Sequence, residues 1–267
     1  MGKTIAIANQ KGGVGKTTTV VAMGGVLVEM GYKVLLMDVD DSGNPSLTKS
    51  LNLSNETNLS ELLITSSMGK VADVRSAIVH HEEGYDVICA DSQLPAITNF
   101  LNGMTDESAK RMLLKNVIAE VKNDYDFILL DAAPSLNIMS INLLSAADEI
   151  IITSQAQGAS EKGIEELLYS ALNVRNMLNH DLYVAGLLIT MVDMRTKYNS
   201  DKVNEMVSMY REKGMHVFNH YIPRSVRAEE WADAGKSIIA YAPKSAPAQA
   251  YRQFVEEYLG DKDNGLK

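Results

Sequence analysis

Short apolar runs recur along the chain and alternate with longer amphipathic segments. Strands that are covered on both faces show continuous apolar runs of this kind, because helices flank a parallel sheet on each side. The runs that we predict as strands are Thr4–Ala8, Lys33–Asp38, Tyr85–Ala90, Tyr125–Asp131, Glu149–Thr153, Leu182–Met191 and His216–Ile222. Pro223 is expected to end the last of them, since proline supplies no amide donor to a sheet.

The segments between these runs carry helical patterns. A polar stretch, Thr105–Ser108, predicts a cap for a helix that runs through about Val121. The other segments with a helical pattern are Thr19–Met30, Asn58–Leu63, a stretch ending near Ala147, Ser160–Leu178, 200–213 and Ala246–Tyr258. Alternating strands and helices require crossover connections, so the sequence predicts an α/β fold with a doubly wound, mainly parallel β-sheet flanked by helices.

One region departs from this alternation. Residues 66–84 are weakly patterned, and we expect a loop-rich insertion there. Within it, His80–Glu83 is expected to be a solvated turn rather than a metal site. No linker rich in Pro, Gly or Ser interrupts the 267 residues, so we expect a single domain, 1–267, whose residues 260–267 form a flexible polar tail.

Composition narrows the class of protein. Hydrophobic residues make up 46% of the chain and charged residues 22%, which is ordinary for a soluble globular protein. Cys89 is the only cysteine, so the chain can form neither an internal disulfide nor a thiolate cluster. We see no signal peptide before the first strand and no apolar run of membrane-spanning length, and we therefore expect a cytoplasmic location.

The net charge of −9 is unevenly distributed. Residues 1–184 hold 13 Lys+Arg against 23 Asp+Glu, a net of −10. Bulk charge therefore argues against the binding of a polyanion by the monomer. Any contact with nucleic acid requires a local basic patch, and the later part of the chain is where one could form.

The segment Lys11–Thr18 lies between the first predicted strand and the first predicted helix. Strand, glycine loop and helix in this order are typical of a phosphate-binding loop, because glycines leave room for backbone N–H groups to surround a phosphate. Lys16 can follow the β- and γ-phosphates, and the Thr17 hydroxyl can hold Mg²⁺. A glycine-rich turn that binds nothing is the alternative. The residues assigned to nucleotide binding here are Lys11, Gly12, Gly13, Val14, Gly15, Lys16, Thr17 and Thr18.

Carboxylates follow two of the predicted strands. Asp38 and Asp40 lie at the end of Lys33–Asp38, and Asp131 ends Tyr125–Asp131. Open α/β sheets bind their ligands at the carboxyl ends of the strands. Asp131 fits a Walker B aspartate, which tunes the Mg²⁺ shell, although a strand-end aspartate that caps the next helix is the alternative.

The phosphate loop has an early lysine, Lys11, and Gln10 where the usual pattern has glycine. This form resembles the deviant Walker A of the ParA/MinD group of ATPases. From end to end the chain resembles a ParA/Soj-type partition ATPase of the short type, which lacks an N-terminal DNA-binding domain. The other stretches that carry the resemblance are Asp38-x-Asp40 with Gly43-Asn44, Phe127–Leu136, Gly186–Thr196, Ile222–Arg227, Glu229-Glu230 and Gly235-Lys236.

The resemblance implies an ATPase that uses ATP and Mg²⁺ and forms a homodimer with two nucleotides sandwiched at the interface. Lys11 of each subunit would reach the phosphates held by the other, Lys16 would bind those of its own subunit, and Asp40 would position the attacking water. The resemblance also assigns Thr17, Asp38 and Asp131 to the metal and Pro223 to the nucleotide.

The resemblance further implies that the dimer binds double-stranded DNA without sequence preference. Arg195, Arg224 and Arg227 match the family positions for that contact, and for each the alternative is a solvated surface charge. Two copies of the patch would give binding that falls steeply with salt. Release would follow hydrolysis stimulated by a ParB-like centromere-binding protein, with the protein associated with the nucleoid and not with a membrane.

The chain departs from the family at one place. Asp41 and Ser42 stand where the family usually has Pro-Gln. An extra carboxylate beside a triphosphate is expected to repel it by about 1 kcal/mol when solvated. Loss of the proline is also expected to free the loop. Both changes would affect hydrolysis and nucleotide affinity.

Other functions remain open from the sequence. A MinD-like membrane-cycling ATPase needs a C-terminal amphipathic helix, whereas 260–267 are polar and unpatterned. ParA-like positioning of a protein cargo fits the same motifs. A nitrogenase-type iron protein would need paired thiolates, and an ATP-dependent amidating enzyme would need a catalytic domain after this one.

Overall fold

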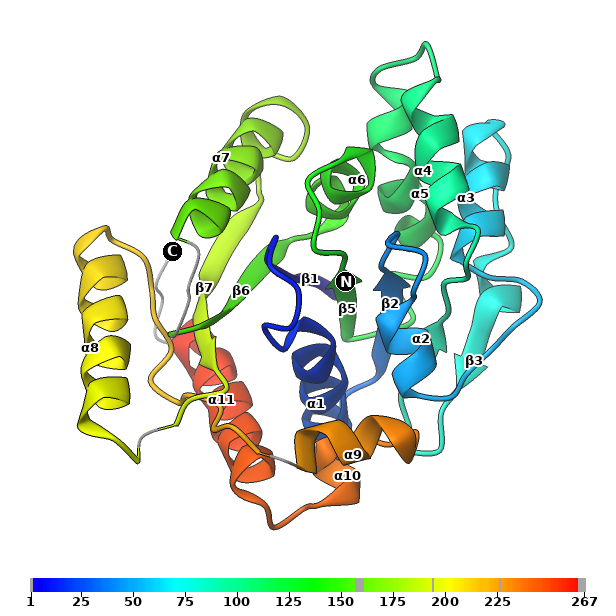
Figure 1. Ribbon diagram of the computed structural model, residues 1–267. Helices are drawn as coiled ribbons and strands as arrows, with labels where there is room; N and C mark the ends of the chain where they lie inside the picture. Colours follow the sequence, from blue (N-terminus) through cyan, green and yellow to red (C-terminus); the bar gives the residue numbers. More distant parts are fainter. Residues whose placement is uncertain (1, 157–160, 194, 226, 264–267) are drawn as a thin grey trace.

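The computed structural model describes residues 2–156, 161–193, 195–225 and 227–263, and a seven-stranded sheet forms its centre (Figure 1). The strands are β1 (Lys3–Ala8), β2 (Val34–Val39), β3 (Ile78–His80), β4 (Asp86–Ile88), β5 (Phe127–Ala132), β6 (Glu149–Gln155) and β7 (Tyr183–Thr190), in the order β3-β4-β2-β5-β1-β6-β7. All neighbours are parallel except β3, which runs antiparallel to β4. The predicted α/β class is confirmed.

Helices cover both faces of the sheet (Figure 1). They are α1 (Lys16–Glu29), α2 (Ser46–Ser50), α3 (Leu59–Ser67), α4 (Leu94–Asn102), α5 (Leu113–Ala119), α6 (Ile138–Ala146), α7 (Glu161–Met177), α8 (Lys197–Glu212), α9 (Arg227–Asp233), α10 (Ile238–Tyr241) and α11 (Ala246–Asp263). Two 3₁₀ turns, Val74–Ala77 and Ala109–Arg111, complete the described elements.

The two faces of the sheet form two hydrophobic clusters, and β1 contributes to both. Ile5 and Ile7 pack in the cluster that contains α1 and α11, whereas Ala6 and Ala8 pack in the cluster that contains α6 and α7. Successive side chains of a strand point to opposite faces, so an unbroken apolar run is what such a strand needs. The core therefore holds β1 rigidly on both sides, directly before the phosphate loop.

The register of the central strands brings the predicted site together. Asp131 of β5 pairs with Ile7 of β1 on one side and with Asp38 of β2 on the other. The loops that follow β1, β2 and β5 therefore leave the sheet at the same edge. This edge is where open α/β sheets bind ligands.

The predicted strand His216–Ile222 is wrong as a member of the sheet. Its backbone contacts with β7 and the residues after it are isolated parallel bridges, Leu187 to Val217 and Val192 to Pro223, and a hydrogen bond from the Ile222 amide to the Ile189 carbonyl oxygen. Its apolar pattern has another cause, because Phe218 packs edge-on against Phe254 with ring centroids 4.9 Å apart. Burial by a helix thus produced a strand-like sequence.

The region 66–84 is more ordered than predicted, since it contains a 3₁₀ turn and the edge strand β3. The expectation of a solvated turn is wrong for His81, which is buried and stacks on Tyr85 with ring centroids 4.7 Å apart. Both features are too short to leave a periodic pattern.

Some helices differ from the prediction. The helix expected after Thr105–Ser108 begins as a 3₁₀ turn and continues as α5. Of the expected tail, 260–263 continue α11, and 264–267 lie outside the described residues. The helices α2, α4, α9 and α10 were not predicted, and all of them are short.

Candidate functional site

The loop between β1 and α1 adopts a conformation that depends on glycine. Gly13 has φ +70° and Gly15 has φ +82°, both in the left-handed region that side chains disfavour. Gly15 is the N-cap of α1, so the unpaired amides at the start of the helix face the same space as the loop. A loop of this shape at a helix N-terminus is suited to bind phosphate groups.

Lys16 is buried and folds back over the loop, where its Nζ donates a hydrogen bond to the Lys11 carbonyl oxygen over 3.1 Å. Burial lowers the pKa of Lys16, and the charges of Asp131 and Asp40 oppose that change. An anion placed in the loop would pair with this ammonium and favour its charged form. Lys16 thus lies beside the loop, at a position from which its ammonium can reach a bound phosphate.

Asn9 fixes the start of the loop, and sequence reasoning missed it. Its Nδ2 donates to the Thr153 carbonyl oxygen over 2.7 Å, while its Oδ1 accepts the Lys11 amide over 2.9 Å. Asn9 is buried, so both bonds are shielded from water. This side chain therefore holds Lys11, which is half-buried, at a defined place relative to β6.

Thr17, Ser46, Asp40 and Asp131 form one cluster of oxygen atoms beside the loop. The Thr17 hydroxyl donates to Asp131 Oδ2 over 2.7 Å and lies 2.9 Å from Ser46 Oγ. Ser46 Oγ lies 3.0 Å from Asp40 Oδ2 and 3.2 Å from Asp131 Oδ2. Ser46 begins α2, a helix that was not predicted, and no motif in the sequence indicated its role.

Asp131 is fully buried, and its Oδ1 accepts no hydrogen bond from any described residue. Burial raises the pKa of Asp131 to about 8, with the charge of Asp38 adding to the effect. A divalent cation would supply the missing partner and stabilise the carboxylate.

The donor set suits Mg²⁺, which prefers oxygen ligands and takes one or two carboxylates together with substrate phosphates. The described part of the chain contains no group of three or more His, Cys, Asp or Glu that could hold a metal by itself. A cation here would therefore depend on the phosphates for further ligands. Thr17 and Asp131 are the residues best placed for it.

Asp38 lies one strand away, and its oxygens have other partners. Oδ2 accepts the Thr48 amide and hydroxyl over 2.8 and 2.7 Å, and Oδ1 accepts the Asp40 amide over 3.1 Å. Burial raises the pKa of Asp38, and the bonds from Thr48 oppose that change. Through these bonds Asp38 orients the backbone that carries Asp40.

A cleft of about 270 Å³ adjoins the phosphate loop on the side of β7. Gln155 Nε2 donates to the Gly13 carbonyl oxygen over 2.7 Å, and Thr190 Oγ1 donates to the Val14 carbonyl oxygen over 2.8 Å. The predicted residue Pro223 lies in the lining, which suits a nucleoside next to bound phosphates. The lining includes Gly15, Thr18, Gln155, Thr190, Asp193 and Pro223.

Of the predicted DNA-binding residues, Arg195 and Arg224 are exposed at the same edge of the sheet. Arg195 pairs with Asp193 through Nε over 2.7 Å, and these bonds lower the pKa of Asp193 to about 2. Arg224 lines the cleft and its amide donates to the Val192 carbonyl oxygen. Arg227 is the first residue of α9. Exposed pairs contribute about 0–1 kcal/mol, so a phosphate could displace Asp193 from Arg195.

Fold and site together define a class of protein, the P-loop nucleotide-binding proteins with a mainly parallel sheet. A family model described as an AAA domain matches residues 2–184. The sporulation initiation inhibitor protein Soj of Bacillus subtilis is 36% identical over 258 residues, covering 96% of this chain and 98% of Soj.

Two further relatives carry related names. The chromosome-partitioning ATPase Soj of Treponema pallidum is 36% identical and covers 97% of this chain and 98% of its own. The chromosome partitioning protein ParA of Caulobacter vibrioides is 33% identical over 99% of this chain and 97% of its own length. The chain belongs to the ParA/Soj family of partition ATPases, as the motifs predicted.

Solved structures are similar over the same length. Cobyrinic acid a,c-diamide synthase from Mycobacterium smegmatis, with bound ADP and magnesium, has a TM-score of 0.83 at 30% identity and covers 100% of this chain and 98% of its own. MinD from Pyrococcus horikoshii, complexed with Mg-ADP, has a TM-score of 0.71 at 23% identity and covers 100% and 98%. The second likeness concerns the fold alone. Both of these proteins hold a nucleotide together with magnesium.

Proposed function

We propose that this chain hydrolyses ATP with Mg²⁺ and partitions DNA as a nucleotide-bound dimer. The observation that carries the proposal is the joint position of Lys16, Thr17 and Asp131 beside a left-handed glycine loop, in a chain of the ParA/Soj family. The loop amides and Lys16 would bind the phosphates, while Thr17 and Asp131 would hold the cation, with Asp38 in support. The cation supplies neutralisation of phosphate charge when it is bound.

Two further residues would act on the reaction itself. Asp40 is buried beside the oxygen cluster and would orient the attacking water. Lys11 would act across the dimer on the nucleotide of the other subunit, as a cation placed on developing charge. The nucleotide-bound dimer would carry two copies of the patch formed by Arg195, Arg224 and Arg227.

The dimer would bind double-stranded DNA without sequence preference, and a ParB-like partner would stimulate hydrolysis and release. With this activity the protein would lie in the cytoplasm, on the nucleoid. In the described ranges no helix has both the length and the apolarity to cross a membrane.

Lys11→Ala and Lys16→Ala test the mechanism as a pair. We expect Lys16→Ala to lose nucleotide binding, because Lys16 contacts the phosphates of its own subunit. We expect Lys11→Ala to bind nucleotide as a monomer, with affinity within about twofold, yet to lose hydrolysis by on the order of a hundredfold or more. Nucleotide titration, light scattering and ADP production measure the three properties.

Two results would contradict the proposal. One is a Lys16→Ala protein that still forms ATP-dependent dimers retained on DNA. The other is a Lys11→Ala protein that hydrolyses ATP at the rate of the unchanged chain.

An amide-forming activity is a second candidate, because the similar structure from M. smegmatis carries that name. The two functions differ in what accelerates ATP turnover. Partition predicts faster ADP production with DNA and a centromere-binding partner, whereas amide synthesis predicts faster production with cobyrinic acid and ammonia. Flotation with liposomes and ATP tests the membrane-cycling alternative.

A further inference from the structure

Asp41 directs its carboxylate away from the phosphate loop and toward the helices beside β2. The side chain is 8% exposed. Asp41 Oδ2 accepts the Thr98 hydroxyl over 2.9 Å and the Asn137 amide over 2.7 Å. The sequence suggested that loss of the proline would free the loop after β2. That expectation is wrong, because Asp41 is bonded to two neighbouring segments. The Asp41 carboxylate restrains the loop through one buried donor, Thr98, and one half-buried donor, Asn137.

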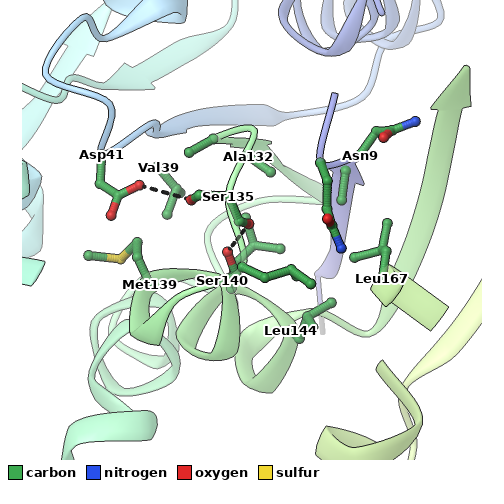
Figure 2. Close-up of a pocket in the computed structure, with 14 residues that line it drawn as sticks. Asn9, Val39, Asp41, Ala132, Ser135, Met139, Ser140, Leu144 and Leu167 are labelled. Atoms are coloured by element: carbon green, nitrogen blue, oxygen red, sulfur yellow. Dashed lines mark hydrogen bonds between the residues drawn. The ribbon is translucent and has the colours of Figure 1, made fainter. Parts of the chain in front are cut away.

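These contacts connect three segments that are distant in sequence. Thr98 lies in the middle of α4, and Asn137 is the N-cap of α6, where its Oδ1 accepts the Met139 and Ser140 amides. The Ser135 hydroxyl reaches Asp41 Oδ1 over a longer 3.4 Å (Figure 2). Asp41 thereby holds the loop after β2 to the loop after β5.

The surroundings leave no room for a ligand at Asp41. The adjoining cavity has a volume of only about 20 Å³, enough for one water, and its lining includes the apolar side chains of Val39, Met139 and Leu167 together with polar Asn9 and Ser135 (Figure 2). The donors on the carboxylate are neutral, and the N-terminus of α6 favours a negative charge nearby. Asp41 is built as a tether rather than as a binding group.

The tether is one peptide bond from the residue that would orient the attacking water. Asp40 Oδ1 accepts the Ser42 amide over 3.0 Å, and the Asp40 amide donates to Asp38 Oδ1. Residues 38–42 are thus joined in two successive turns that meet at Asp40, and Asp41 lies within the second turn. A displacement of Asp41 would move Asp40 directly.

We propose that Asp41 is a positioning residue for ATP hydrolysis, which holds Asp40 and the loop 133–137 in one fixed arrangement. The inference rests on the proposed ATPase function. In this chain the Asp41 carboxylate and its donors Thr98 and Asn137 restrain the loop after β2.

Substitutions at Asp41 and at its partner Asn137, singly and together, test the positioning role of Asp41. Asp41→Ala removes the tether, and Asn137→Asp sets two carboxylates against each other while it keeps a good N-cap for α6. We expect each to lower kcat on the order of tenfold, with nucleotide affinity within about twofold of the unchanged chain. The double variant Asp41→Asn/Asn137→Asp restores an amide opposite a carboxylate, and its kcat should recover to within about threefold.

Asp91→Ala is the matched control. Asp91 also accepts two side-chain donors, Ser60 Oγ over 2.6 Å and Asn58 Nδ2 over 3.3 Å, but it follows β4 instead of β2. We expect its Tm to fall while kcat stays within about twofold, because general loss of stability does not move Asp40. A full kcat in Asp41→Ala, or a double variant no faster than Asn137→Asp, overturns the proposal.

Hydrogen exchange on the nucleotide-free protein tests the tether without any turnover. In Asp41→Ala we expect faster exchange in 40–46 and 133–140 together, and in Asp91→Ala in neither segment. Unchanged exchange in both segments of Asp41→Ala overturns the tether. A chain that hydrolyses no ATP would refute the proposed function, and this measurement would still decide what Asp41 does.

Discussion

At the scale of single residues, Asp131 combines full burial with an oxygen that lacks a partner among the described residues. Its pKa is raised to about 8, whereas an unfolded chain gives aspartate its ordinary value near 3.8. The folded state therefore binds a proton that the unfolded state releases across this range. Its contribution to stability is complete below the ordinary pKa and is lost as the pH rises through about 8.

We predict that the nucleotide-free protein loses unfolding free energy between about pH 5 and pH 8, and that Asp131→Asn removes most of this loss. One pKa unit corresponds to about 1.4 kcal/mol. Between pH 5 and pH 8 the unchanged chain should therefore lose at least about 2 kcal/mol more unfolding free energy than Asp131→Asn. Urea unfolding at several pH values measures it. Asp124→Asn, at an exposed pair with Arg75, is the control.

Magnesium gives the same residue a second test. With ADP bound, Mg²⁺ should raise the Tm of the unchanged chain and leave that of Asp131→Asn unaltered, because the amide cannot replace the carboxylate. A variant with the same magnesium response as the unchanged chain would remove Asp131 from the metal site.

At the scale of elements, the turn between β3 and β4 holds the junction of α9 and α10. Glu83 accepts the Ser237 amide over 2.6 Å and also the Ser237 hydroxyl. His81 contacts the Gly235 carbonyl oxygen over 3.1 Å. Arg227 begins α9, so the position of a predicted DNA-binding residue depends on a turn more than a hundred residues earlier in the chain.

We predict that Glu83→Ala lowers the free energy of unfolding by about 1–3 kcal/mol, because it leaves the buried amide and hydroxyl of Ser237 without their acceptor. Glu82→Ala is the matched neighbour. It removes only an exposed pair with Lys236 and should cost about 0–1 kcal/mol. Trp231, the only tryptophan, lies in α9 and reports unfolding by fluorescence. Equal losses of unfolding free energy in the two variants would refute this role of Glu83.

At the scale of the whole molecule, an acidic chain is expected to bind DNA through one edge. Arg195 follows β7, and Arg224 follows Pro223, which forms an isolated bridge with Val192 just beyond the end of β7. Each protein group that neutralises a DNA phosphate releases counterions, so the number of neutralised phosphates appears in the salt dependence of binding. Dimerisation would double that number without any new residue.

We predict that Arg195→Ala and Arg224→Ala each weaken ATP-dependent DNA binding and reduce the slope of log K against log salt by about 1 for every phosphate that the variant no longer neutralises. Arg252→Ala is the control, because Arg252 pairs with Glu29 between α11 and α1. Fluorescence anisotropy with DNA at several salt concentrations measures the slope. Slopes equal to that of the unchanged chain would place the DNA-binding surface elsewhere.

The sequence alone determined the sheet class, the phosphate loop and the carboxylates at the strand ends. Each of these features depends on contiguous residues. The apolar run, the glycine loop and the lysine are neighbours in the chain, so a local pattern is enough to predict them. The long strands were found for the same reason, since burial on both faces needs an unbroken apolar run. Short elements such as β3 and α2 leave no such pattern.

Only the tertiary structure decided how residues from separate segments combine. Ser46 joins Thr17 and Asp131 because β2 and β5 are adjacent in the sheet, and nothing near Ser46 in sequence records that. The role of Asp41 likewise depended on whether its carboxylate faced the nucleotide or α4 and α6. Charge and residue type are local properties, whereas burial, direction and partners follow from the packing of the whole chain.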